Sequence, residues 1–158
     1  MRRFRSRSDS VEMRLSPEEV EALSLLRGVL SSVGREVGDP AAERLSVAAY
    51  PDDQEAQAEY GRLMAPELEG QRKRDRAAVA SSLDAARRGP VGLSLAEADS
   101  WLMVINEARL ALAARLGIEK EGWGLPGDRG GFLAPDMALL VYLTEVQDDL
   151  ISALAELI

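Results

Sequence analysis

The stretch that decides the fold runs from Ser94 to Ile118 and reads SLAEADSWLMVINEARLALAARLGI. Its apolar side chains recur every three or four residues, the spacing that places them on one face of an α-helix; they are Ala98, Trp101, Leu102, Ile105, Leu112 and Leu116. Ser94 and Glu97 form a capping box, and Gly117 followed by Ile118 is a typical C-terminal stop. The stretch therefore predicts a long helix over residues 95–116 that faces a core.

Further helices are expected on both sides of this one. Ser16, Pro17 and Glu19 start a helix whose apolar stripe is Val20, Leu23, Leu26, Leu30, Val33 and Val37. A short helical turn opens at Asp39-Pro40, and Asp52 or Asp53 caps the next helix. Pro66 is expected to divide that helix from a polar one over residues 67–87. The last helix starts at about Asp136 and carries five acidic residues and no basic one.

The remaining segments are short or irregular. Val11, Met13 and Leu15 alternate with charged residues, which predicts a short hairpin in the arm over residues 1–15. Residues 89–92 form a break, and residues 119–135 form a long loop rich in glycine and proline. The expected fold is mainly α: residues 1–158 form a single-domain helical bundle of four long helices and one or two short ones, with a short N-terminal β-hairpin.

Composition removes several classes of function. The 158 residues include no cysteine and no histidine, and the net charge is −8. Thiol nucleophiles, histidine general bases and Cys/His metal sites are therefore excluded, and no recognisable catalytic motif remains. No apolar run approaches the length of a membrane helix. We expect a cytoplasmic protein that is not an enzyme and needs no cofactor.

Arg109 is the most informative polar residue, because it interrupts the apolar seam of the 95–116 helix. A guanidinium that faces a core needs a partner, and the candidate carboxylates are Asp39, Asp52, Asp53 and Glu145. One interpretation is a buried ion pair that ties the helix to the turn from Tyr50 to Asp53; the other is a pocket that binds a carboxylate or phosphate. The predicted buried polar cluster or partner contact consists of Arg109, Asp52, Asp53, Tyr50, Asn106 and Gln147.

Two other interpretations concern charged segments. Glu145 and Asp148 resemble half of an acidic Mg²⁺ motif, so a nucleotide- or Mg²⁺-binding protein that uses Arg109 and carboxylates is the alternative function. Residues 72–76 are basic and could contact phosphates, but no aromatic side chain among them could stack on a base. DNA binding is the third choice, and a solvated basic face that contacts the acidic last helix of a neighbour, as in a homo-oligomer, is preferred.

An ordered set of short motifs resembles a known family. The motifs are Asp39-Pro40, Arg44-Leu45, Ala49-Tyr50, Asp52-Asp53, Glu55-Ala56, Glu59-Tyr60, Arg72, Trp101-Leu102, Asn106, Arg109-Leu110, Leu112, Arg115-Leu116-Gly117-Ile118, Tyr142-Leu143-Thr144 and Gln147. Together they resemble an actinobacterial domain-of-unknown-function family, number two thousand and seventeen in that series, from about residue 12 to residue 154. The turn after Leu45 departs from the family, since Ser46-Val47 stands where relatives often have proline.

The resemblance implies a small intracellular protein with no agreed catalytic residues, whose gene often lies beside that of the Clp-protease adaptor. We therefore expect a protein-interaction module whose partner belongs to the Clp adaptor and protease system or is another cytosolic protein. It would dock through helix faces or through the loop over residues 119–135.

Overall fold

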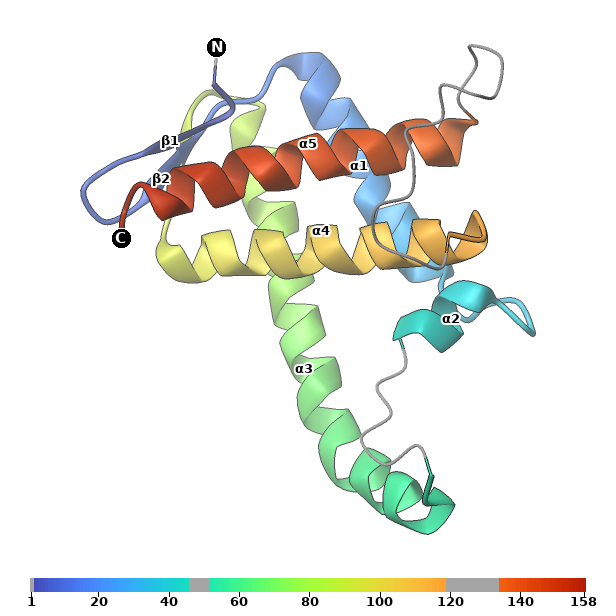
Figure 1. Ribbon diagram of the computed structural model, residues 1–158. Helices are drawn as coiled ribbons and strands as arrows, with labels where there is room; N and C mark the ends of the chain where they lie inside the picture. The colour runs from blue at the N-terminus through green and yellow to red at the C-terminus, as the bar shows by residue number, and fades with distance from the viewer. Residues whose placement is uncertain (1, 46–51, 119–133) are drawn as a thin grey trace.

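The computed structural model describes residues 2–45, 52–118 and 134–158. In chain order, its elements are β1 (Phe4–Ser6), β2 (Val11–Met13), α1 (Pro17–Ser32), α2 (Pro40–Leu45), α3 (Gln54–Ala86), β3 (Val91–Leu93), α4 (Leu95–Arg115) and α5 (Pro135–Ala155). Figure 1 shows α4 at the centre of the molecule, with α5 beside it and α3 crossing it. The prediction of a mainly α fold with four long helices, a short one and an N-terminal hairpin is confirmed.

Helix α4 forms as the sequence predicts and supplies the centre of the core. The Ser94 and Glu97 side chains cap its start reciprocally. At its end, Ile118 N–H donates to the Ala113 carbonyl at 2.8 Å and Gly117, with φ of +75°, donates to Ala114 at 3.1 Å. These two hydrogen bonds form a Schellman motif. Trp101 and Ile105, one turn apart on the same face, are fully buried, while Met103 between them is 51% exposed, so α4 packs along one broad apolar face.

A three-stranded antiparallel sheet closes one end of the bundle, in the order β1-β2-β3. Phe4 pairs with Met13 and Val11 pairs with Leu93, and all four side chains are buried. The hairpin prediction is confirmed, but the predicted break at residues 89–92 is wrong, since Val91–Leu93 forms the third strand. A three-residue strand with glycine at its centre is too short to show a period of two.

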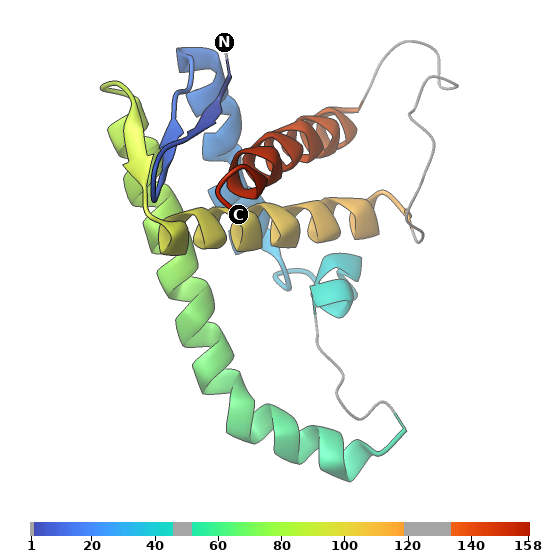
Figure 2. The same cartoon turned by 60° about the vertical axis from the view of Figure 1, so that its left-hand side comes forward.

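Helix α3 passes through Pro66 without a break, so the prediction of two separate helices is wrong. Proline removes one backbone hydrogen bond, and the helix bends in its N-terminal part instead of ending, as Figure 2 shows. Its first buried residue is Asp75, and only the part from there to Ala86 packs in the bundle. The first half of α3 therefore projects away from the other helices (Figure 2).

Helix α1 ends at Ser32, earlier than its predicted stripe. Gly34 and Gly38 have φ of +81° and +79°, which turns the chain back, and Val37 is fully exposed. Asp39 holds this turn: its carboxylate accepts N–H bonds from Gly34 and Ala41 and pairs with Arg115 at 2.9 Å. The Arg115 side chain and these N–H groups hold the pKa of Asp39 well below its ordinary value.

Arg3 connects the sheet to α1 and α5 through ion pairs. Its guanidinium pairs with Glu19 of α1 and Asp149 of α5 and lies 5.3 Å from the centre of the Tyr142 ring. The Tyr142 hydroxyl donates to Glu19 at 3.3 Å. The Arg-rich N-terminus thus docks on the acidic last helix of its own chain. Burial, reinforced by the nearby Glu19 charge, raises the pKa of Tyr142 to about 12.

This raised pKa predicts an alkaline transition. The folded protein keeps Tyr142 protonated above the ordinary tyrosine pKa of 10.0, so its contribution to stability is complete below pH 10 and is lost as the pH rises toward 12. The difference in absorbance at 295 nm between the wild type and Tyr142→Phe should therefore titrate near pH 12. A difference that titrates near pH 10 would contradict the buried hydroxyl.

Candidate functional site

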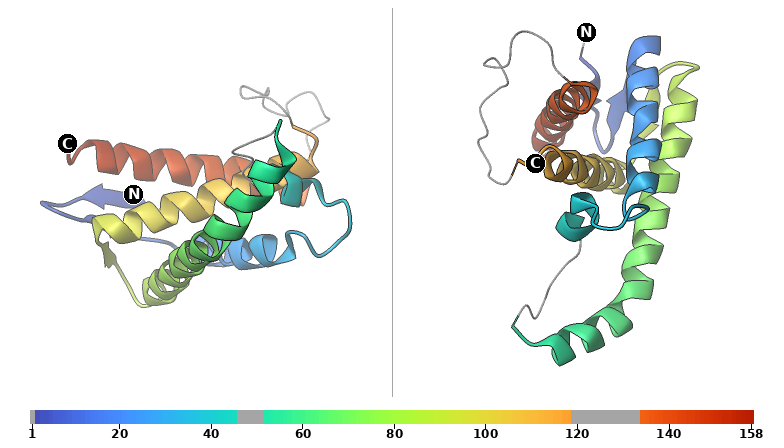
Figure 3. Two further views of the ribbon diagram at one scale, coloured as in Figure 1. Left: turned by 90° about the horizontal axis from the view of Figure 1, so that it is seen from below. Right: turned by 90° about the vertical axis from the view of Figure 1, so that its right-hand side faces the viewer.

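A groove with a volume of about 710 Å³ lies between α1 and the C-terminal half of α3. Figure 3 shows the two helices side by side, with the rest of α3 continuing past the end of α1. Aliphatic side chains of α1, α3 and α4 line the groove: Leu23, Leu26, Leu30, Val79, Leu83 and Val104. Most of this lining is continuous with the hydrophobic core.

The hollow follows from the small residues on α3. Ala77 and Ala80 line the groove where a larger side chain would fill it. The aliphatic residues of α1 recur every three or four positions and turn toward α3 along the same length. Val79 and Leu83 of α3 are buried against the leucines of α1 and form the floor, and the exposed Ala77 and Ala80 leave the groove open above it.

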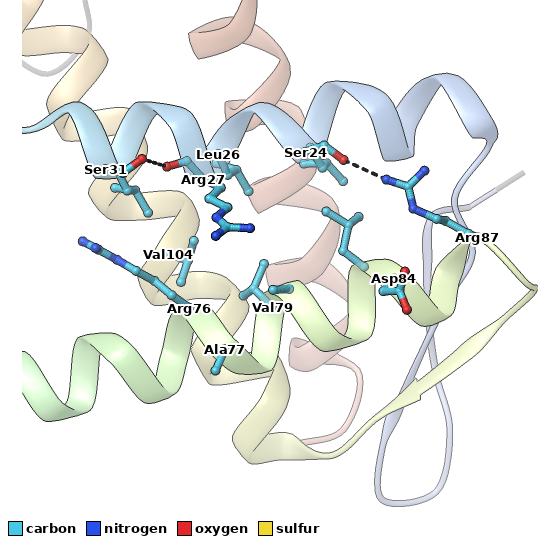
Figure 4. A pocket seen from close by; sticks show the side chains of 14 residues that line it. Ser24, Leu26, Arg27, Ser31, Arg76, Ala77, Val79, Asp84, Arg87 and Val104 are labelled. Atoms are coloured by element: carbon cyan, nitrogen blue, oxygen red, sulfur yellow. Dashed lines mark hydrogen bonds between the residues drawn. The ribbon is translucent and has the colours of Figure 1, made fainter.

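Three arginines surround this apolar floor: Arg27 of α1 and Arg76 and Arg87 of α3 (Figure 4). Arg87 lies at the edge, 3.4 Å from both the exposed Glu21 carboxylate and the Ser24 hydroxyl. Arg27 forms no ion pair with any residue that the structure describes. Asp84 is the one acidic residue in the lining, and it pairs with Arg88 at 3.6 Å. The rim is therefore positively charged.

Arg76 connects the groove to α4. Its guanidinium lies 3.4 Å from Glu107, a carboxylate that Arg72 also approaches at 3.6 Å. The Arg76 Nε is buried and has no hydrogen-bond partner within the described residues. A buried donor without a partner is costly, so an acceptor that entered the groove would gain from meeting it.

Arg109 does not form the predicted ion pair. At the interface of α4 and α5, its Nε donates to the Thr144 hydroxyl at 3.1 Å and its Nη1 donates to Gln147. Among the four candidate carboxylates, Asp39 pairs with Arg115 and Glu145 lies 3.9 Å from Arg3. The expectation of a carboxylate partner is wrong for the described chain, because Arg109 is half-buried and neutral acceptors one turn apart on α5 bind it.

The other predicted site residues are dispersed. Asp53 is exposed and caps α3 by accepting the Ala56 N–H at 3.0 Å, and Asp52 is exposed beside it. Asn106 is exposed on α4, and Tyr50 lies outside the described residues. The structure therefore brings together only Arg109 and Gln147 from the predicted cluster.

Of the two acidic residues proposed for Mg²⁺, Glu145 lies 3.9 Å from the Arg3 guanidinium and Asp148 is exposed on α5. In the ranges 2–45, 52–118 and 134–158, no group of three or more Asp, Glu, His or Cys side chains is placed to hold a metal ion.

No sequence pattern predicts the groove, which forms only when α1 and α3 pack together. Arg76 lies in the basic segment 72–76, whereas no local motif marks Arg27 or Arg87 as part of a site. A local pattern could not reveal them because they lie about sixty residues apart along the chain. Ala77 and Ala80 are the local signal for the groove, since small exposed residues beside a packed face leave room for a ligand.

The fold and the groove define a small, mainly helical protein with a capping three-stranded sheet and an apolar trough rimmed by arginine. The chain belongs to the family described as Domain of unknown function (DUF2017), whose model matches residues 1–154. The resemblance found in the sequence is thereby confirmed. No curated protein and no solved structure matches the chain. Within its described residues, no helix is long and apolar enough to span a bilayer.

Proposed function

We propose that this protein is a non-enzymatic interaction module that binds an acidic, amphipathic helix of a partner protein in the α1–α3 groove. The observation that carries the proposal is the combination of three arginines, Arg27, Arg76 and Arg87, with an aliphatic floor. Helix-in-groove recognition uses this arrangement: apolar side chains of the ligand enter the trough and its polar face meets the rim.

Charge favours a protein partner over a nucleic acid. The whole molecule carries a net charge of −8, which repels phosphate backbones at long range. Several basic side chains of α3 already contact protein groups: Arg72 reaches the Leu45 carbonyl and Glu107, and Arg74 bonds Gln71 at 2.9 Å. Two of the rim arginines also have carboxylates nearby, Arg76 beside Glu107 and Arg87 beside Glu21. The aliphatic floor therefore carries the preference, because a protein helix offers apolar side chains to fill it and a phosphate backbone does not.

The family resemblance supplies one partner system to test. It implies a link to the Clp-protease adaptor, and on that basis we propose the Clp adaptor and protease system as the first candidate. An adaptor or protease subunit would bind through an exposed helix with acidic residues. The groove proposal itself depends on the arginine rim and not on this particular partner.

Cross-linking from inside the groove tests the proposal. A photoreactive amino acid at Ala80 of the full-length protein, in cells of its source, should form an adduct with a second polypeptide. The double variant Arg27→Glu, Arg87→Glu should abolish that adduct, because it reverses two of the three rim charges. The matched control Arg5→Glu, Arg35→Glu changes two exposed arginines elsewhere and should leave the adduct unchanged.

The outcomes discriminate sharply. An adduct that contains a different protein, and that the groove variant loses, supports the proposal. The absence of any protein adduct, or an adduct that persists in the groove variant, would overturn it. Titration of the purified Clp adaptor, followed by fluorescence anisotropy, then decides whether that system supplies the partner.

A further inference from the structure

Helix α3 is divided into two halves of opposite charge. Residues 52–70 contain six acidic side chains and one basic one, Arg62; the acidic ones are Asp52, Asp53, Glu55, Glu59, Glu67 and Glu69. Residues 71–88 contain six basic side chains and only two acidic ones, Asp75 and Asp84. Within α3 itself, Gln54–Ala86, the first half carries four of these acidic side chains and the second half carries four of the basic ones, so one continuous helix of 33 residues has an acidic and a basic half.

The acidic half stands apart from the bundle and exposes apolar surface. Leu63 is 66% exposed and Leu68 is 39% exposed. Leu68 lies seven residues before the buried Asp75, so it continues the face that α3 turns toward the core. Figure 2 shows this part of the helix extending beyond the other elements. We call residues 52–68 the acidic arm.

We infer that the acidic arm binds in the α1–α3 groove of a second copy of this chain, and that the second arm binds reciprocally. This inference rests on one part of the proposed function, the helix-binding groove, and it names a second copy of this chain as an occupant of that groove. The arm supplies the chemistry that the groove requires, since it is an amphipathic helix with exposed leucine and clustered carboxylates. Two such contacts would form at once about a two-fold axis, as in most homodimers.

The geometry of one long helix permits this exchange. An antiparallel pairing of two α3 helices centred on Gly70 places Leu63 of one copy near Ala77 of the other and residue 53 near Arg87. The arm of 17 residues spans about 25 Å as a helix, and residues 76–87 span about 17 Å, so the arm covers the groove. Arg88 already pairs with Asp84, which limits repulsion between that acid and the arm.

A charge exchange tests the pairing. The wild type should sediment as a dimer at micromolar concentrations and should dissociate as salt is raised. The groove variant Arg27→Glu, Arg87→Glu and the arm variant Glu55→Arg, Glu59→Arg should each weaken dimerisation at least tenfold. An equimolar mixture of the two variants should form a heterodimer, because every reversed groove then meets a reversed arm. The control Arg5→Glu, Arg35→Glu should remain dimeric.

Disulfide trapping tests the register. The chain contains no cysteine, so introduced cysteines report only on each other. Leu63→Cys chains mixed with Ala77→Cys chains should form a crossed disulfide under mild oxidation. The exposed Leu25→Cys on α1 is the control partner and should react more slowly with Leu63→Cys.

A monomeric wild type would overturn the inference, as would failure of the charge-exchanged mixture to associate or a crossed disulfide no faster than the control. The proposed function has its own test. It fails if the Ala80 probe forms no adduct with another protein, whether or not the chain dimerises. A monomeric protein whose Ala80 probe cross-links to a different protein would contradict only the reciprocal binding of the acidic arms, which we call the arm exchange. A third outcome is a dimer that is restored in the mixture of the two charge-reversed variants but whose Ala80 probe cross-links only to a second copy of the chain. That outcome would support binding of the arm in the groove and would exclude a different protein as the ligand of the groove.

Discussion

Replacing Trp101 by alanine is expected to lower the free energy of unfolding by about 3–5 kcal/mol. Trp101 is fully buried at the centre of α4, and its indole N–H donates to the Ser82 hydroxyl of α3 at 2.8 Å. The substitution removes the largest fully buried side chain among the described residues and leaves a cavity between the helices that the core cannot easily close. A loss of this size is a large fraction of the stability of an ordinary domain.

Urea unfolding followed by circular dichroism at 222 nm measures the effect. Trp101→Phe keeps much of the volume and removes the N–H, so it should cost clearly less than the alanine variant. Ser82→Ala keeps the indole and leaves its N–H without that acceptor, which should cost about 1–3 kcal/mol. If Trp101→Ala lost less than about 1 kcal/mol, the packing of α3 against α4 described above would be wrong.

The elements that the sequence predicts correctly are those with local signals. The capping boxes at Ser16 and Ser94 and the Schellman motif at Gly117 depend on residues within one turn of a helix end, and all three form as expected. Arginine at position 109 was correctly noticed as an interruption of an apolar seam. Its partners could not be predicted, since they depend on the rotation of α5 against α4.

The errors concern contacts or backbone adjustments that a local pattern does not encode. Proline normally ends a helix because it removes a hydrogen bond, but α3 continues through Pro66 and bends in its N-terminal part. Strand β3 exists because β2 provides hydrogen-bonding partners for Val91–Leu93. The groove likewise exists only where the alanines of α3 meet the leucines of α1. Each feature depends on a neighbour that lies far away along the chain.

The continuity of α3 through Pro66 matters for the proposed dimer. A helix that ended at Pro66 would have left the acidic residues 52–65 as a separate element free to pack elsewhere. Because the helix continues, Glu55 and Glu59 lie on the projecting N-terminal half of α3. The C-terminal half of the same helix is held in the core by the buried Val79 and Leu83. The arm exchange inferred above therefore requires the continuity through Pro66 that the sequence alone did not suggest.

The second large effect is expected at the attachment of the sheet. Arg3→Ala should lower the free energy of unfolding by about 2 kcal/mol. Hydrogen bonds to charged groups contribute about 1.5–3 kcal/mol each, and the pair with Asp149 is discounted because that carboxylate is 45% exposed. Arg3 also contacts the face of Tyr142, which adds about 0.5–1 kcal/mol at such a site.

The stability lost in Arg3→Ala should be confined to the N-terminal hairpin. Without Arg3, Glu19 keeps the Ser16 N–H and the Tyr142 hydroxyl, so α1 remains capped while β1 loses its attachment to α1 and α5. Amide hydrogen exchange should therefore rise in residues 4–13 before it rises in α4. Arg5→Ala on β1, two residues further along the chain, is the control, because its side chain is exposed, and it should change the free energy of unfolding by less than about 0.5 kcal/mol. Equal losses for Arg3→Ala and Arg5→Ala would contradict an attachment through Arg3, since only one of these arginines reaches α1 and α5.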